Sequence, residues 1–92
     1  MVTAIILVNT QHGAINDVAQ KLADIPGVSE VYSTGGQYDI VAVIRVASNE
    51  AIADLVTDHM TKIEGIAHTE TMIAFKSYSQ HDLEAVFSIG ND

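Results

Sequence analysis

Two stretches of this chain, IPGVSEVYST at residues 25–34 and IEGIAHTETM at 63–72, resemble each other position by position. Both place an isoleucine, a glycine and an aliphatic residue at matching positions. Each stretch follows a segment whose apolar residues recur at the spacing of an amphipathic helix, and each enters a predicted strand after its glycine. The repeat therefore predicts two βαβ-like halves, and it constrains the fold more than any other feature of the sequence.

The predicted strands are four. Residues 3–10 (TAIILVNT) and 39–46 (DIVAVIRV) are apolar runs rich in β-branched residues, which is typical of strands that are apolar on both faces. Residues 28–33 alternate weakly and residues 67–76 alternate well enough for a strand, so a second and a fourth strand are expected there.

The first helix is predicted from apolar residues at i, i+3, i+4 and i+7, which are Ile15, Val18, Ala19 and Leu22. It should end before Pro26 and Gly27. Ser48 or Asn49 can cap a second helix that Gly65 closes. The apolar stripe of this second helix consists of Ile52, Leu55, Val56, Met60 and Ile63.

A short C-terminal helix is predicted last. Ser79 stands three residues before Asp82, the spacing of a capping box, and an apolar face follows before Gly90.

This order, βαββαβ, predicts an α+β fold of ferredoxin-like type, with a four-stranded antiparallel sheet and both helices on one face. Residues 1–92 are expected to form a single domain with a core of about residues 3–78. The other face of the sheet is left without a cover, and 48% of the 92 residues are hydrophobic. A chain this small cannot bury so much apolar surface alone, so we expect a second subunit to cover that face.

The charge balance excludes some partners. Twelve acidic residues against four basic ones give a formal charge of −8, which repels a phosphate backbone, so direct binding of nucleic acid is not expected. The chain has no cysteine, which fits a reducing compartment. No segment approaches a membrane span and the amino terminus lacks the pattern of a signal peptide, so a cytoplasmic location without membrane contact is expected.

The loop GGQYD at residues 35–39 is the first candidate binding element. Gly35 and Gly36 are predicted to supply positive φ for a hairpin turn. Their backbone N–H groups can form a small nest for a carboxylate, while Asp39 can accept an ammonium group and Tyr38 can supply an apolar wall. The alternative is an ordinary hairpin turn in which Asp39 caps its own turn.

Thr69 and Thr71 form the second candidate. Because they stand two residues apart on a predicted strand, their hydroxyls point to the same face and can donate to one ligand. The alternative is that they are ordinary β-branched strand residues.

The sequence contains no motif that indicates a metal site or a catalytic site. The four histidines are His12, His59, His68 and His81. No two of them stand at helical metal spacing, and no nucleophile elbow or glycine-rich phosphate loop is present. We therefore expect no metal, no cofactor and no catalytic residue.

Three motifs occur in a specific order: P-G-V before the second predicted strand, G-x-Y-D before the third, and G-x-x-x-T-x-T entering the fourth. With IPGVSEVYSTGGQYDIVAVIRV at 25–46 and IEGIAHTETMIAF at 63–75, the chain resembles the effector-binding (RAM) domain of the Lrp/AsnC family of transcriptional regulators. The resemblance covers about residues 3–78.

The resemblance implies a dimer of the dimeric α/β-barrel type, built by pairing sheets face to face, with dimers assembling into rings such as octamers. It also implies that an effector, usually an amino acid, binds in a cleft between subunits near the G-x-Y-D loop. The matching positions here are Gly36, Tyr38 and Asp39, with Gln37 as the variable member, together with Thr69 and Thr71.

One departure from the family is large. Full-length members carry an N-terminal helix-turn-helix domain, whereas the first strand here begins almost at Met1, so a stand-alone effector domain is expected. A role in gene regulation would then require a DNA-binding relative of the same family, with which this chain could assemble.

The sequence thus predicts a non-catalytic, homo-oligomeric domain that senses an amino acid at a subunit interface. An enzyme of the dimeric α/β-barrel kind, such as a small monooxygenase or isomerase, is the alternative. A purely structural assembly module is a third possibility, and it predicts no response to ligand.

Overall fold

The computed structural model describes residues 1–78. The predicted C-terminal helix from Ser79 onward lies outside these residues. The elements are β1 (Val2–Thr10), α1 (Ile15–Ala23), β2 (Val28–Ser33), β3 (Ile40–Val46), α2 (Asn49–Asp54), a π-helical turn η1 (Leu55–His59), a 3-10 turn η2 (Met60–Lys62) and β4 (Ile66–Ile73).

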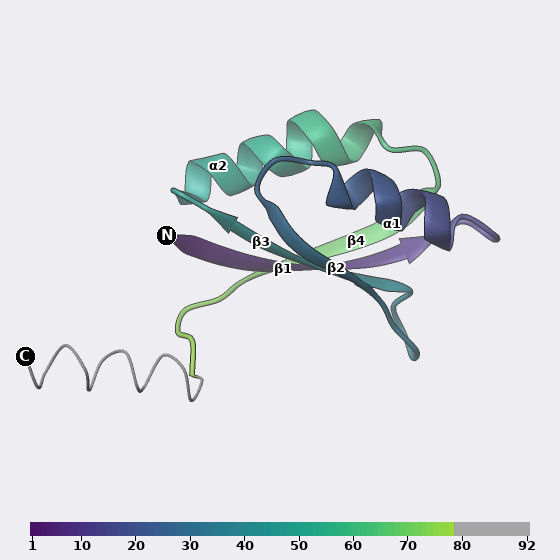
Figure 1. The fold of residues 1–92 in the computed structure, drawn as a ribbon, viewed down its shortest axis with the longest axis horizontal. Coiled ribbons are helices and arrows are strands. Elements are labelled where there is room, and N and C mark those ends of the chain that lie inside the picture. The colour runs from purple at the N-terminus through teal and green to yellow at the C-terminus, as the bar shows by residue number, and fades with distance from the viewer. Residues whose placement is uncertain (79–92) are drawn as a thin grey trace, which may run out of the picture.

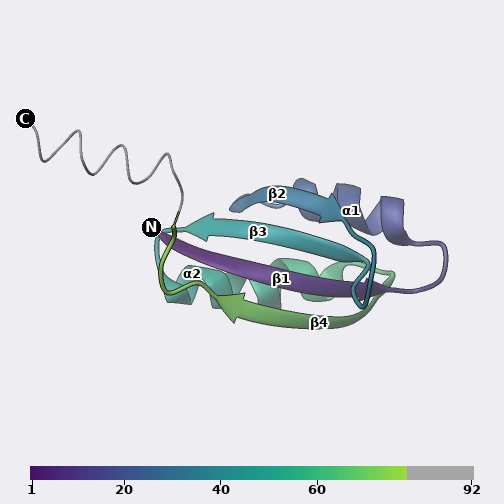
Figure 2. The ribbon, with the colours of Figure 1, turned by 90° about the horizontal axis from the view of Figure 1, so that it is seen from below.

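The four strands form one antiparallel sheet in the order β2-β3-β1-β4. Both helices lie on the same side of this sheet (Figure 1). Seen from below, the strands stand in front of the helices with no described element covering them (Figure 2). The predicted βαββαβ fold of ferredoxin-like type is therefore confirmed.

Alternation along the central strands decides which side chains form the core. In β1, Ala4, Ile6 and Val8 are fully buried beneath the helices, whereas the intervening Ile5 and Leu7 are only half-buried. Strand β3 shows the same alternation. Because successive side chains point to opposite faces, the apolar runs cover both faces, but one chain buries only the helix side.

We call the face opposite the helices the open face. Its central apolar residues are Ile5, Leu7, Val41 and Val43, all half-buried.

The second helix is less regular than its apolar stripe predicted. It begins as predicted, since the Ser48 side chain accepts a hydrogen bond from the Ala51 N–H at 3.1 Å. It then changes to a π-helical and a 3-10 turn. The Thr57 hydroxyl donates to the Ala53 carbonyl at 2.8 Å, and this kind of back-bonding competes with the regular backbone ladder.

The internal repeat has a structural counterpart in two glycines. Gly27 and Gly65 occupy the same place before β2 and β4, and both have φ of +99°. At the hairpin, only Gly36 has a positive φ, of +108°, so the prediction of positive φ was right for Gly36 and wrong for Gly35. One left-handed residue is enough to reverse this turn.

No helix within residues 1–78 is both long enough and apolar enough to cross a lipid bilayer.

Candidate functional site

The loop from β1 to α1 and the hairpin from β2 to β3 emerge at the same end of the molecule (Figures 1 and 2). Asp39 lies at this end, directly before β3. Its backbone N–H donates to the Val8 carbonyl at 2.9 Å, and its carbonyl accepts from the Thr34 N–H at 2.9 Å. The backbone of Asp39 is thus held by β1 on one side and by the β2 end of the hairpin on the other.

The Asp39 carboxylate is held by β1 as well. Its Oδ2 accepts the Thr10 N–H at 2.9 Å and lies 3.4 Å from the Thr10 hydroxyl. These donors are 29 residues away in the chain. The described carboxylate bonds therefore link two strands, and the alternative in which Asp39 caps its own turn is not what the structure shows.

Two hollows meet at Asp39. The first, of about 450 Å³, is lined by Gly13, Ile15, Asn16, Ser33, Thr34 and Asp39. The second, of about 350 Å³, is lined by Thr10, Gln11, His12, Gly13, Ile15 and Asp39. Both volumes lie within the range of small-molecule sites, roughly 300 to 1,000 Å³.

Sequence reasoning missed the part that residues 10–16 play in these hollows. Residues 11–13 and Asn16 carry no motif, and they are distant from the G-x-Y-D loop in the chain. The only available signal was topological: in an antiparallel sheet, the end of β1 lies beside the start of its neighbour β3.

Gly36 and Gln37 form the exposed part of the hairpin. A Cβ placed on Gly36 would meet nothing within 4 Å, so its backbone is open to an approaching group. Neither residue lines the two hollows.

Tyr38 turns away from Asp39. Its hydroxyl donates a hydrogen bond to the Glu70 carboxylate on β4, and this hydrogen bond raises the pKa of Tyr38 above its ordinary value. Glu70 pairs with Leu7, so it projects on the open face. Within one chain, Tyr38 spans the open face and does not wall the hollows.

Thr69 and Thr71 share one face of β4, as predicted. They pair with Val8 and Ile6, so both lie on the helix side of the sheet. Strand β1 separates them from Asp39, and fully buried core side chains such as Val8 fill the space beneath the helices. A single chain therefore does not bring the two predicted parts of the site together.

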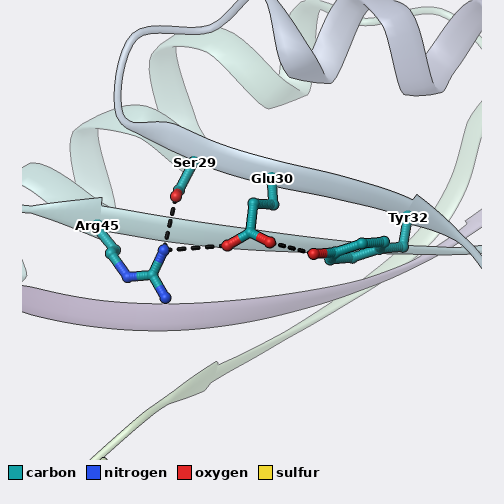
Figure 3. Close-up of polar contacts among 4 residues, drawn as sticks. All are labelled: Ser29, Glu30, Tyr32 and Arg45. Atoms are coloured by element: carbon teal, nitrogen blue, oxygen red, sulfur yellow. Dashed lines mark hydrogen bonds and ion pairs between the residues drawn. The ribbon is translucent and has the colours of Figure 1, made fainter. Parts of the chain in front are cut away.

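A polar cluster lies at the β2 edge of the sheet, and sequence reasoning did not single it out (Figure 3). Arg45 Nη1 donates to Ser29 Oγ at 2.7 Å and to Glu30 Oε1 at 3.2 Å, while the Tyr32 hydroxyl donates to Glu30 Oε2. The hydrogen bond from Tyr32, followed by that from Arg45, lowers the pKa of Glu30.

The same contact with Glu30 raises the pKa of Tyr32. Glu30 and Tyr32 pair with Val43 and Val41, which places them on the open face. All members of the cluster are exposed, so the ion pair contributes little to stability in one chain. The cluster does give the apolar centre of the open face a polar border.

Among residues 1–78, no three or more His, Asp and Glu side chains gather closely enough to hold a metal ion.

Comparison with known proteins identifies the sequence relationship. The model of the Lrp/AsnC ligand binding domain matches residues 3–83. The HTH-type transcriptional regulator FL11 of Pyrococcus furiosus is 37% identical over 79 residues, which are 86% of this chain and 52% of the regulator. The chain thus spans about half the length of the curated relatives that it matches.

Solved structures show the same fold. The protein TTHA0845 from Thermus thermophilus superposes with a TM-score of 0.81 at 36% identity, covering 87% of this chain and 100% of that one. The feast or famine regulatory protein of M. tuberculosis, solved in complex with L-methionine, gives a TM-score of 0.71 at 26% identity, covering 87% and 54%. The names of the family and the regulators support ligand binding and regulation over enzymatic activity, as the sequence predicted.

Proposed function

This chain belongs to the Lrp/AsnC ligand-binding domain family, and we propose that it is a non-catalytic, homo-oligomeric domain that binds an amino acid at an interface between subunits. The observation that carries the proposal is the position of Asp39. A carboxylate held by two donors of Thr10, facing hollows of small-molecule size, is suited to accept a ligand ammonium.

The ligand carboxylate requires donors of its own. We assign this role to the backbone N–H groups around Gly36 and to the hydroxyls of Thr69 and Thr71. Tyr38 and Gln37 do not line the hollows within one chain, so they shape the remaining wall from a neighbouring copy. A hydrogen bond to a charged group contributes roughly 1.5 to 3 kcal/mol before desolvation is subtracted. Micromolar to millimolar affinity is the expected result, which suits the sensing of a metabolite.

The threonines and Asp39 must then come from different copies of the chain. Strand β1 and the packed core separate Thr69 and Thr71 from Asp39 in one chain, by two strand spacings or about 10 Å. A ligand held by both groups therefore lies between subunits, with the hairpin of one copy and strand β4 of another forming its two sides.

The open face provides the surface for the first level of assembly. Its central residues Ile5, Leu7, Val41 and Val43 are apolar, and Tyr–Glu pairs border them toward both edges of the sheet. An apolar centre with a polar rim is typical of protein interfaces. Two copies joined through this face form a dimer, and dimers joined at the ligand site form a ring such as an octamer.

Ligand binding at such an interface is coupled to assembly. A ligand that contacts two chains stabilises the oligomer that presents its site, by thermodynamic linkage. The regulatory output proposed here is the assembly state itself, passed to a DNA-binding member of the same family that shares the ring.

A thermal-shift screen against the proteinogenic amino acids at millimolar concentration tests the proposal. At least one of them should raise the melting temperature of the wild-type protein. Asp39→Asn should lose most of this shift, because a neutral amide cannot form an ion pair with the ammonium group of the ligand. A wild-type protein that responds to none of them would remove the proposed function, and an undiminished response of Asp39→Asn would remove Asp39 from it.

Co-expression of two defective chains tests whether the site is shared. Asp39→Asn and a Thr69→Ala, Thr71→Ala double variant should each fail to respond alone. If the site combines Asp39 of one chain with the threonines of another, mixed oligomers contain intact sites and regain part of the response. If both parts came from one chain, no mixture would respond.

A further inference from the structure

The two hollows beside Asp39 differ in the polar side chains that they expose. In the first hollow, the donor of the Thr34 hydroxyl is already used, since it donates to the Tyr38 carbonyl at 2.7 Å. Asn16 and Ser33 line the same hollow and make no side-chain hydrogen bond among residues 1–78. Their polar groups are therefore available to a ligand.

Ile15 contributes the apolar part of the first hollow, and Gly13 leaves space beside it. A Cβ on Gly13 would meet nothing within 4 Å. Among residues 1–78, no lysine or arginine lines either hollow. The first hollow thus offers one carboxylate, one carboxamide, the hydroxyl of Ser33 with its donor unused, the hydroxyl of Thr34 as an acceptor, and an aliphatic wall.

We propose that the first hollow receives the side chain of the bound amino acid, and that Asn16 on α1 determines which amino acid is preferred. This inference rests on the proposed function, in which Asp39 holds the ligand ammonium. The side chain of an amino acid branches from the carbon that carries the ammonium, so a ligand anchored at Asp39 places its side chain beside this carboxylate, which lines both hollows. We assign the side chain to the first hollow because Asn16 and Ser33 offer polar groups there.

The lining defines the class of ligand. A carboxamide and a hydroxyl can each donate and accept hydrogen bonds, so together they complement a ligand carboxamide or hydroxyl. An acidic ligand side chain would face Asp39 without a compensating cation, since the described lining residues include none. The preferred ligands are therefore amino acids with a small, uncharged, polar side chain.

Specificity of this kind arises because an unpaired polar group disfavours an apolar ligand. Loss of one neutral hydrogen bond reduces affinity by roughly two- to tenfold. Asn16→Ala should therefore reduce the ratio of affinities for L-asparagine or L-serine over L-leucine by that factor. Ser33→Ala should act in the same direction.

Gln20 supplies the matched control. It is an exposed carboxamide on the same helix, and it lies outside both hollows. Dissociation constants for L-asparagine, L-serine and L-leucine, measured by calorimetry for the wild type, Asn16→Ala and Gln20→Ala, test the inference. Support requires that the ratio changes in Asn16→Ala and stays at the wild-type value in Gln20→Ala.

A second readout follows the carboxamide directly. The side-chain NH₂ resonances of Asn16 should shift on addition of L-asparagine, whereas those of Gln20 should not. If Asn16→Ala keeps the wild-type ratio while Asp39→Asn still abolishes binding, the role of Asn16 is refuted and the proposed function stands. If none of these amino acids, nor any other in the screen, binds the wild type, both fall together.

Discussion

The hydroxyl of Tyr38 donates a hydrogen bond to the carboxylate of Glu70, 32 residues further along the chain. Tyr38 belongs to the hairpin before β3 and Glu70 to β4, and strand β1 lies between β3 and β4. The contact therefore fastens the hairpin across the open face. Asp39, the next residue, bonds instead to Thr10 and lines a hollow with Ile15 and Asn16 of α1, so adjacent residues of one motif have different surroundings.

The hydrogen bond from Tyr38 to Glu70 predicts that the free energy of unfolding depends on pH in the alkaline range. Glu70 raises the pKa of Tyr38 above its ordinary value of 10.0. The stability from this hydrogen bond is present below the unfolded-state pKa and is lost as pH rises through the higher folded-state value. In the alkaline range, the free energy of unfolding of the wild type should fall more steeply with pH than that of Tyr38→Phe.

Tyr78→Phe is the control for this experiment, because Tyr78 is 79% exposed at the end of the described chain. Urea unfolding at a series of pH values gives the slopes. Equal slopes in the wild type and Tyr38→Phe would show that the contact does not form in solution.

The polar cluster around Glu30 predicts how substitutions change the pKa of Glu30. The carboxyl pKa lies below 4.5, first because Tyr32 donates a hydrogen bond and second because Arg45 does. Tyr32→Phe should raise the pKa of Glu30 toward its ordinary value, and Arg45→Gln, which removes both a hydrogen bond and a positive charge, should raise it as well. Titration of the side-chain carboxyl carbon by NMR measures both changes.

The sign of the linked stability is opposite to that of Tyr38. A lowered folded-state pKa contributes stability above the unfolded-state value, and this is lost as pH falls through the folded-state value. A carboxyl of Glu30 that titrates identically in the wild type and Tyr32→Phe would contradict the cluster.

Replacing three glycines by alanine should lower the free energy of unfolding by different amounts. In Gly27→Ala, φ of +99° is unfavourable for a side chain and the new Cβ lies 2.8 Å from Val46 Cγ1. Gly36→Ala has the unfavourable φ alone, and Gly35→Ala has neither penalty. The loss of unfolding free energy should be largest for Gly27→Ala, about 1 kcal/mol for Gly36→Ala, and within about 0.5 kcal/mol of zero for Gly35→Ala.

Chemical denaturation of the three variants gives this order. A cost for Gly35→Ala equal to that for Gly27→Ala would disagree with the backbone described here.

The open face predicts the behaviour of a charged variant. Leu7 is half-buried at the centre of this face, so Leu7→Lys places a charge in the proposed subunit interface. Its mass by light scattering should fall to that of smaller species at the same concentration. Ala53→Lys, at an exposed position of α2 on the opposite side of the sheet, should keep the wild-type mass.

Circular dichroism shows whether both variants keep their secondary structure. An oligomer of wild-type mass formed by folded Leu7→Lys would exclude this face as the interface.

Much of the fold could be predicted because its signals are local. Apolar residues at helical spacing marked α1, and the repeat around Gly27 and Gly65 marked the entry into β2 and β4. Exact limits were harder to predict, since β4 ends at Ile73 and not at residue 76. The π-helical turn in the second helix was not predicted; the Thr57 hydroxyl, which lies in this turn and donates to the Ala53 carbonyl, competes there with the backbone ladder.

The candidate site was only partly predictable. Spacing alone put Thr69 and Thr71 on one face of a strand, whereas the GGQYD motif and the family resemblance together pointed to Asp39 as an ammonium acceptor. Neither could show which residues stand beside Asp39, because neighbours in a sheet are set by strand order, and sequence distance does not record that order. Only the packed sheet, with β1 between β3 and β4, placed residues 10–16 against Asp39 and kept the threonines apart from it.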